Sequence, residues 1–168
     1  MLACVDVHYL EHEARGALLL FPDWTAEAAT EQHVVHVPSP AGYRPGHFYE
    51  RELPVLRALL ARVARPVSIV LIDGYVWLSA SNEKGLGAHL YEALGGALPV
   101  VGVAKTAFKG SDFAVPVRRG DATRPLYVTA VGMDAGVAAG HVRAMHGPYR
   151  IPTLLKDVDR LSRASDSR

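Results

Sequence analysis

The strongest restriction on the fold of this chain is the run VSIVLID at 67–73, which is apolar on both faces until its final aspartate. A half-buried strand alternates apolar and polar residues, whereas a continuously apolar run predicts a strand that is covered on both faces. Such strands are usually parallel and central in their sheet. The run LPVVGVAK at 98–105 has the same character. Two strands of this kind need helices on both sides, so the chain is expected to adopt an α/β fold.

The segments around these two runs predict a mixed sheet. Three β-rich segments at short spacing come first, at 2–9, 15–22 and 32–38, and they suggest an antiparallel meander. Two further strands are predicted at 113–119 and 124–131, and helices at 50–64, 85–95, 151–164 and directly after Asp134. Pro54 fits only the first turn of its helix, and Asp134 is a suitable N-cap. We expect a sheet that is antiparallel on one side and parallel on the other, with ligands near the carboxyl ends of its central strands.

Composition excludes several classes of protein. Hydrophobic residues make up 49% of the 168 residues and charged residues 21%, which excludes a mainly disordered chain. A net charge of +1 excludes a globally basic coat for nucleic acid, although it allows a local basic face. The single cysteine, Cys4, excludes an intrachain disulfide framework.

The same reasoning gives an expectation for location and domain organisation. No apolar run reaches the roughly 20 residues needed to span a bilayer, and the first residues lack the basic start of a signal peptide. We therefore expect a cytoplasmic protein with no membrane partner. A single domain is predicted over 1–164, followed by a polar tail at 165–168.

Three acidic residues stand outside the polar stretches that hold most acids of this chain, and a carboxylate within an apolar strand is costly unless it is paired or bound to a cation. Asp6 interrupts the first strand, Asp73 ends the most apolar strand, and Glu52 lies near the start of the first long helix. If the strands that carry Asp6 and Asp73 are neighbours, the two carboxylates repel each other unless a cation lies between them. Mg²⁺ or Mn²⁺ suits such oxygen ligands. Each residue also has an ordinary interpretation, as a solvent-facing strand residue, a strand-end turn or a first-turn helix acid.

The segment YRPGHFYERELP at 43–54 resembles the signature of the endonuclease V family, in which a Tyr-x-Pro-Gly turn leads to an Arg-Glu pair. Four other segments resemble the family in the expected order: 5–7, 70–74, 101–105 and 149–152. The resemblance runs from about residue 3 to about residue 157.

This resemblance implies a ribonuclease-H-like fold and cleavage of a phosphodiester near a deaminated base, especially inosine, in DNA or RNA. It implies Mg²⁺ as the cofactor, with Mn²⁺ as a substitute, and nucleic acid as the partner. Asp6, Glu52 and Asp73 would bind metal and act in catalysis together with Lys105, which would approach the reacting phosphate. The residues implied to contact nucleic acid are Tyr43 as a wedge, Pro45 and Gly46 in its turn, Gly74 near the displaced base, and Tyr75, which could stack on a base or belong to the core.

The chain departs from the family pattern in three places. The helical segment that usually precedes the first strand is missing. The family's late Gly-His pair is replaced by Gly132-Met133-Asp134, where Asp134 is either a substitute metal ligand or simply a helix cap. The loop at 75–84 lacks the usual His, Pro and Arg residues.

Two hypotheses of different kinds follow. The first is an active metal-dependent endonuclease that serves nucleic-acid repair or processing. The second is a catalytically weakened nucleic-acid-binding protein on the same scaffold, and a nuclease for another structured substrate, such as a branched or flapped strand, is a variant of the first. The sequence does not define the oligomeric state, and a monomer is favoured.

Overall fold

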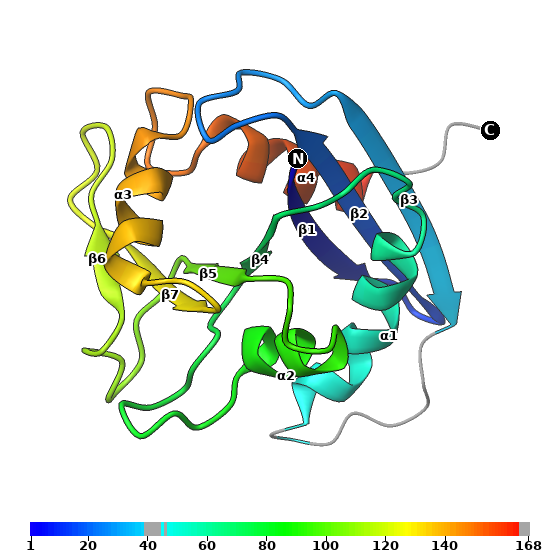
Figure 1. Ribbon diagram of the computed structural model, residues 1–168, viewed down its shortest axis with the longest axis horizontal. Coiled ribbons are helices and arrows are strands. Elements are labelled where there is room, and N and C mark those ends of the chain that lie inside the picture. Colours follow the sequence, from blue (N-terminus) through cyan, green and yellow to red (C-terminus); the bar gives the residue numbers. More distant parts are fainter. Residues whose placement is uncertain (39–44, 46, 165–168) are drawn as a thin grey trace.

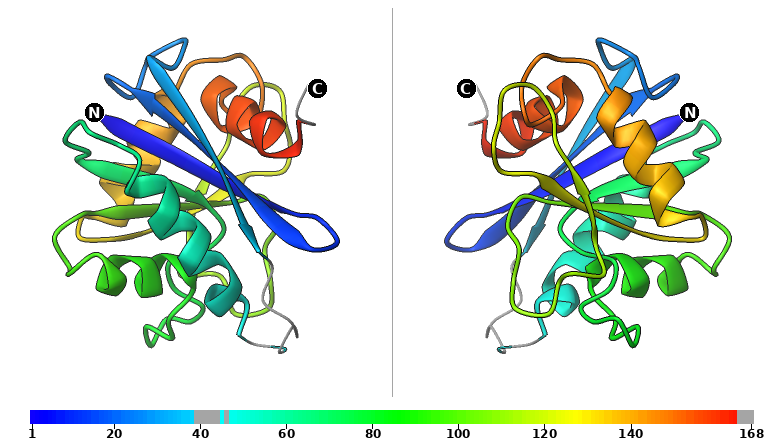
Figure 2. Two further views of the ribbon diagram at one scale, coloured as in Figure 1. Left: turned by 90° about the vertical axis from the view of Figure 1, so that its right-hand side faces the viewer. Right: turned by 90° about the vertical axis from the view of Figure 1, so that its left-hand side faces the viewer.

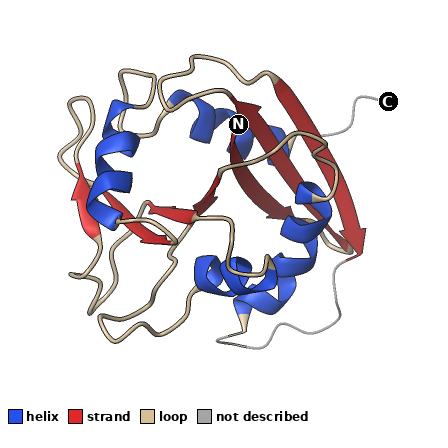
Figure 3. Ribbon diagram, in the orientation of Figure 1, coloured by secondary structure: helices blue, strands red, loops and turns tan. Residues whose placement is uncertain are grey.

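The computed structural model describes residues 1–38, 45 and 47–164, and it contains a seven-stranded sheet in the order β3-β2-β1-β4-β5-β7-β6 (Figure 1). The strands are β1 (Leu2–Tyr9), β2 (Glu13–Phe21), β3 (Glu31–Pro38), β4 (Ile69–Asp73), β5 (Val100–Ala104), β6 (Val115–Val117) and β7 (Leu126–Val131). The helices are α1 (Phe48–Leu60), α2 (Leu86–Ala93), α3 (Ala135–Ala144) and α4 (Thr153–Arg163), shown in blue in Figure 3. The predicted fold class, a mixed α/β sheet flanked by helices, is confirmed.

The directions of the strands agree with the prediction on one side of the sheet and differ on the other. β1, β2 and β3 form the predicted antiparallel meander, and β1, β4 and β5 run parallel. Beyond this parallel part, β7 pairs antiparallel with β5 and β6 antiparallel with β7, so the predicted parallel side is limited to β1, β4 and β5. A parallel pair needs a crossover connection, usually through a helix, and the chain between β5 and β7 contains only the short strand β6.

Helices cover both faces of the sheet, and the alternation of side chains along each strand separates two cores (Figure 2). On β1, Leu2 and Cys4 face the core beneath α3 and α4, whereas Ala3 and Val5 face the core beneath α1 and α2. This double burial explains why the central strands lack a polar face. Within the described ranges, none of the helices has the length and apolar character that crossing a bilayer requires.

Helix α1 begins earlier than predicted. It starts at Phe48, so Pro54 lies inside the helix and not in its first turn, which corrects the prediction for this residue. Proline lacks the N–H that would bond the carbonyl four residues earlier, so the helix loses one internal hydrogen bond there. Pro54 is exposed, and the helix continues because Val55, Leu56 and Leu59 beyond it are buried in the core.

Gly16 on β2 sets how closely α1 approaches the sheet. A Cβ atom at this position would lie 2.5 Å from Val55 Cγ1 and 2.9 Å from Leu59 Cδ1, both on α1. These distances are far shorter than van der Waals contact, so only glycine allows the helix to pack as it does. This contact positions the helix that carries Glu52.

We predict that Gly16→Ala lowers the free energy of unfolding by about 1–3 kcal/mol, because it overpacks the contact between β2 and α1. Gly140→Ala is the matched control, since Gly140 lies within α3 and has no atom within 4 Å of the added Cβ. The control should gain about 0.5–1 kcal/mol from the higher helix propensity of alanine. Urea unfolding measures both, and equal midpoints for the two variants would contradict this packing account.

Candidate active site

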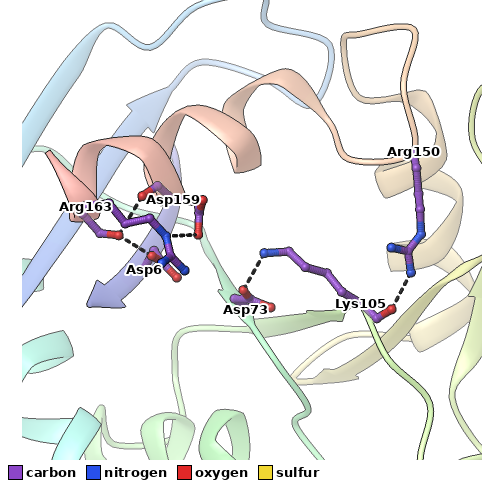
Figure 4. Close-up of polar contacts among 7 residues, drawn as sticks. Asp6, Asp73, Lys105, Arg150, Asp159 and Arg163 are labelled. Carbon is purple, nitrogen blue, oxygen red and sulfur yellow. Dashed lines mark hydrogen bonds and ion pairs between the residues drawn. The ribbon is translucent and has the colours of Figure 1, made fainter. Parts of the chain in front are cut away.

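Two carboxylates meet at the carboxyl ends of neighbouring parallel strands. β1 pairs with β4 in a register that sets Val5 opposite Ile72, so the next residues, Asp6 and Asp73, follow side by side. Asp6 is half-buried, and the Asp73 side chain is 41% exposed. The two aspartates are therefore neighbours, as predicted. Figure 4 shows Asp6 and Asp73 between α4 and Lys105.

Glu52 joins the two aspartates from helix α1. Its side chain is buried, and it lines one pocket together with Asp6, Asp73, Phe48 and other residues; the pocket has a volume of about 190 Å³. Burial, with the charges of Asp6 and Asp73, raises the pKa of Glu52 to about 8, although Arg51 opposes the shift. The structure therefore brings the three predicted carboxylates together, and their role as metal ligands stays a prediction.

Lys105 follows β5 and supplies positive charge to this cluster. Its Nζ donates to Asp73 Oδ2 at 2.8 Å. Burial lowers the pKa of Lys105, but the hydrogen bond and charge of Asp73 outweigh it, aided by Asp159 and Asp6, so the pKa is raised overall. Lys105 is therefore a charged ammonium group that offsets the repulsion among the carboxylates.

Arg150, in the segment after α3, fixes the backbone beneath Lys105. Its guanidinium donates to the carbonyl of Lys105, as Figure 4 shows. It also donates to the carbonyl of Pro125 at 2.9 Å and to that of Arg124 at 3.0 Å. These bonds join the end of β5 to the start of β7. Arg150 belongs to the segment at 149–152 that resembles the family, and these bonds give it a structural role at the edge of the site.

A fourth carboxylate, Asp159 on α4, was missed by the sequence analysis. Asp159 lines a small pocket with Asp6, Asp73 and Lys105, on the α4 side of the sheet. It stands in a helix rich in charged residues, where an acid is typical of a solvated face. The signal that could have found it is helical spacing, since Asp159 lies four residues after Leu155 and three before Ser162, on a stripe that faces the sheet.

Ser162 links α4 directly to Asp6. It is fully buried, and its hydroxyl donates to Asp6 Oδ2. Burial raises the pKa of Asp6, the bond from Ser162 opposes the rise, and the charges of Asp73 and Asp159 add to it. With these partners in place, no group of three or more His, Cys, Asp or Glu residues in the described part of the chain is already arranged to hold a metal ion.

A third pocket opens beside Asp73. It has a volume of about 170 Å³ and is lined by Asp73, Gly74, Tyr75, Phe48 and other residues. Gly74 has φ +128, a conformation that L side chains rarely adopt, and a Cβ there would meet nothing within 4 Å. The glycine therefore lets the chain turn sharply after Asp73 and leaves an uncovered backbone surface.

Tyr75 is anchored at the edge of this pocket. Its hydroxyl donates to the carbonyl of Thr106 at 2.8 Å, and its ring meets the ring of Phe108 edge-on with centroids 4.9 Å apart. The half-buried tyrosine thus packs against its neighbours and lines the pocket, and stacking on a base stays a prediction. Trp77, in the same loop, donates from Nε1 to the carbonyl of Ala130 at 3.0 Å.

Most of the remaining residues that are predicted to contact nucleic acid lie outside the described ranges. Tyr43 and Gly46 lie outside the described residues, as does the tail at 165–168. Pro45 is an exposed turn residue. The wedge role of Tyr43 therefore stays a prediction from the resemblance.

Asp134 does not join the carboxylates, which corrects the prediction of a metal ligand at this position. β7 is antiparallel to β5 with Val131 opposite Val100, so the chain after β7 leaves at the end of the sheet away from Asp73 and Lys105. Asp134 is the N-cap of α3, and its Oδ1 accepts from the N–H of Val137 at 2.9 Å. The alternative interpretation, a helix cap, is the one confirmed.

The arrangement defines a class of protein. Carboxylates at the ends of central parallel strands, in a mixed sheet covered by helices on both faces, belong to the ribonuclease-H-like class of α/β proteins. A family profile described as Endonuclease V matches residues 1–146. Endonuclease V of Xanthomonas oryzae pv. oryzae is 40% identical over 185 residues, which cover 96% of this chain and 76% of the relative. The chain belongs to the endonuclease V family, as its resemblance indicated.

Further relatives agree in sequence and in fold. Endonuclease V of Streptomyces coelicolor is 31% identical over 96% of this chain and 77% of its own. The crystal structure of the catalytic domain of human endonuclease V has a TM-score of 0.76 at 24% identity, covering 96% of this chain and 80% of that one. Ciona intestinalis endonuclease V, in complex with DNA containing an inosine followed by a ribo-adenosine, has a TM-score of 0.76 at 16% identity, covering 96% and 83%. At these identities the structural likenesses support the fold.

We predict that Asp134→Ala lowers the free energy of unfolding by about 0.5–2 kcal/mol through loss of the cap, without changing the rate of nucleic-acid cleavage. Asp134→Ser, which keeps a capping oxygen, should restore most of the stability. Urea unfolding and a cleavage assay on the same preparations measure the two effects. A Ser variant that is stable but cleaves much more slowly would show that Asp134 acts in the site after all.

We predict that the metal-free protein loses stability as the pH rises from about 5 to about 8. The pKa of Glu52 lies near 8 in the folded protein, against an ordinary value of 4.5, so the folded state binds more protons than the unfolded state across this interval. Stability must then fall with rising pH, by at most about 1.4 kcal/mol per pH unit from this group.

Glu52→Gln is the test of this assignment, because an amide does not titrate. Urea unfolding in EDTA at several pH values should show that the free energy of unfolding depends less on pH in the variant than in the natural protein. At pH 8 the variant should be the more stable of the two. Parallel profiles for the two proteins would contradict the assignment to Glu52.

Proposed function

We propose that the protein is a divalent-metal-dependent endonuclease that cleaves a phosphodiester near a deaminated base, above all inosine, in DNA or RNA, in nucleic-acid repair or processing. The observation that carries the proposal is the convergence of Asp6, Glu52 and Asp73 on one pocket. The pocket at Gly74 and Tyr75 shares Asp73 with it, so a bound base would lie beside the reaction site. Membership in the endonuclease V family supports the same activity.

The donor chemistry of the pocket fits a divalent ion. Asp6, Glu52, Asp73 and the neighbouring Asp159 offer only carboxylate oxygens, which suit a hard ion such as Mg²⁺, with Mn²⁺ as a substitute. Burial and the charges of Asp6 and Asp73 raise the pKa of Glu52, and a divalent ion beside it would favour its ionised form. We propose Asp6, Glu52 and Asp73 as the ligands. When bound, such an ion supplies Lewis-acid stabilisation of charge on the phosphate oxygens.

The side chains around the carboxylates suggest further roles. Lys105 presents an ammonium group at the end of β5, where it would meet a phosphate as a point charge. The pocket at Gly74 has room for a flat ring against uncovered backbone, and Tyr75 lies at its edge. An extruded base loses its stacking in the strand, and Tyr43 would fill the resulting gap. We also keep the cytoplasm as the proposed location, since the single cysteine of the chain suits a reducing compartment.

One departure from the family pattern carries less weight than the sequence suggested. The segment Gly132-Met133-Asp134 precedes α3 at the other end of the sheet, so its missing histidine removes nothing from the carboxylate pocket. Asp159 supplies an additional acid from α4. The main reason to expect a catalytically weakened binding protein is thereby removed. The altered loop at 75–84 still favours testing another structured substrate.

We predict that the protein cleaves inosine-containing DNA or RNA in Mg²⁺ or Mn²⁺, and that Asp73→Ala and Asp6→Asn each slow cleavage at least about a hundred-fold. Asp157→Asn is the matched control, because Asp157 is an acid on α4 that pairs with Arg160 and does not line the carboxylate pocket. Denaturing gels of end-labelled substrates measure the rates and the position of the cut.

The outcomes of this assay separate the hypotheses. Equal cleavage by Asp73→Ala and the natural protein would reject the proposed site. Binding without cleavage, by both the natural protein and Asp73→Ala, would favour the nucleic-acid-binding protein. Cleavage restricted to branched or flapped substrates without inosine would keep the nuclease and replace its substrate.

A further inference from the structure

Two cations from separate elements sit against the carboxylates. Lys105, after β5, pairs with Asp73 at 2.8 Å. Arg163, in the last turn of α4, pairs with Asp159, with Nε 3.1 Å from Oδ1. Figure 4 shows Arg163 and Asp159 close to Asp6 and the pair of Lys105 and Asp73 beside them. Arg163 also lines the same 190 Å³ pocket as Glu52, so it stands at the place where the carboxylates are open to solvent.

Both cations face the whole cluster and not only their partners. Arg163 lines the pocket of Asp6, Glu52 and Asp73. Lys105 lines the smaller pocket of Asp6, Asp73 and Asp159. The Arg163 side chain is 59% exposed and that of Lys105 is 38% exposed, so each can exchange its partner for water or another ion.

We propose that Lys105 and Arg163 are internal counter-ions, which hold the carboxylates together when no divalent ion is bound and compete with that ion for them. The inference rests on the proposed function, because it assumes that these carboxylates are the ion's ligands. Asp73 Oδ2 forms an ion pair with the ammonium of Lys105, and Asp159 Oδ1 forms an ion pair with the guanidinium of Arg163. An incoming ion that binds Asp73 must weaken its pair with Lys105, and it also lies close to the like-charged guanidinium of Arg163, which lines the same pocket, so the two side chains set its affinity.

The neighbouring residue Arg160 gives a matched control. It lies on the same helix and pairs with Asp157 at 3.5 Å, but it belongs to a different pocket and does not line the one that holds Glu52. Arg160→Gln therefore removes the same charge and a similar exposed pair without touching the carboxylate cluster. Any effect of net charge alone appears equally in both arginine variants.

The test is direct titration of the metal-free full chain with Mn²⁺, followed by the electron paramagnetic resonance signal of the unbound ion. Removing a competing cation should tighten binding, by about two-fold for Arg163→Gln and about five-fold for Lys105→Met in 50 mM KCl. The gain should shrink in 500 mM KCl, because salt screens exposed charges. Arg160→Gln should bind Mn²⁺ as the natural protein does.

Thermal melting gives a second readout that involves no cleavage. In EDTA, Lys105→Met should melt lower than the natural protein by roughly 2 °C, because the carboxylates lose a counter-ion. Saturating Mn²⁺ should remove most of this difference. Arg160→Gln reports the effect of an unrelated surface pair.

Failure of the counter-ion role can be distinguished from failure of the proposed function. If the natural protein binds Mn²⁺ and both Lys105→Met and Arg163→Gln bind it equally or more weakly, the counter-ion role is overturned and the proposed function stands. A Lys105→Met variant that melts like the natural protein in EDTA also overturns the counter-ion role. If the natural protein binds no Mn²⁺ at millimolar concentrations, the metal-dependent function falls together with the inference.

Discussion

The site depends on the electrostatic repulsion between Asp6 and Asp73, which the parallel pairing of β1 with β4 forces on the protein. The register places one carboxylate beside the other at the ends of two buried strands, where their like charges repel each other. The structure responds by bringing cationic and hydroxyl groups to these oxygens, namely Lys105 to Asp73 and Ser162 to Asp6. A divalent ion, with two positive charges, would offset the same repulsion more strongly. The arrangement therefore suits metal-dependent chemistry.

The two-faced sheet explains how distant parts of the chain reach one place. Helix α1 packs on one face and contributes Glu52, whereas α4 packs on the other face and contributes Asp159 and Ser162. Both helices reach the carboxyl ends of the central strands, so the site is assembled around the end of the sheet. Gly16 and Arg150 hold the framework nearby, the first by allowing α1 to approach and the second by fixing the backbone of Lys105.

Much of this was predictable from the sequence, and the failures have physical reasons. Continuous apolar runs identified the central strands. The positions of Asp6, Glu52 and Asp73, together with the resemblance to the endonuclease V family, pointed to the three acids that the structure brings together. Asp159 was missed because an acid in a charged amphipathic helix looks solvated unless the facing sheet is known. The direction of β7 depends on how the chain returns after β5, which apolar patterning does not encode. The position of Asp134 follows from that direction, which places the residue at the end of the sheet away from the carboxylates.

The most direct test of this account is a crystal of the protein grown with Mn²⁺ and measured for anomalous scattering. The account predicts an anomalous peak bounded by carboxylate oxygens of Asp6, Glu52 and Asp73, with the Lys105 ammonium moved away from Asp73. A peak at Asp134, or carboxylates that stay paired with Lys105 and Ser162 while Mn²⁺ binds elsewhere, would contradict it.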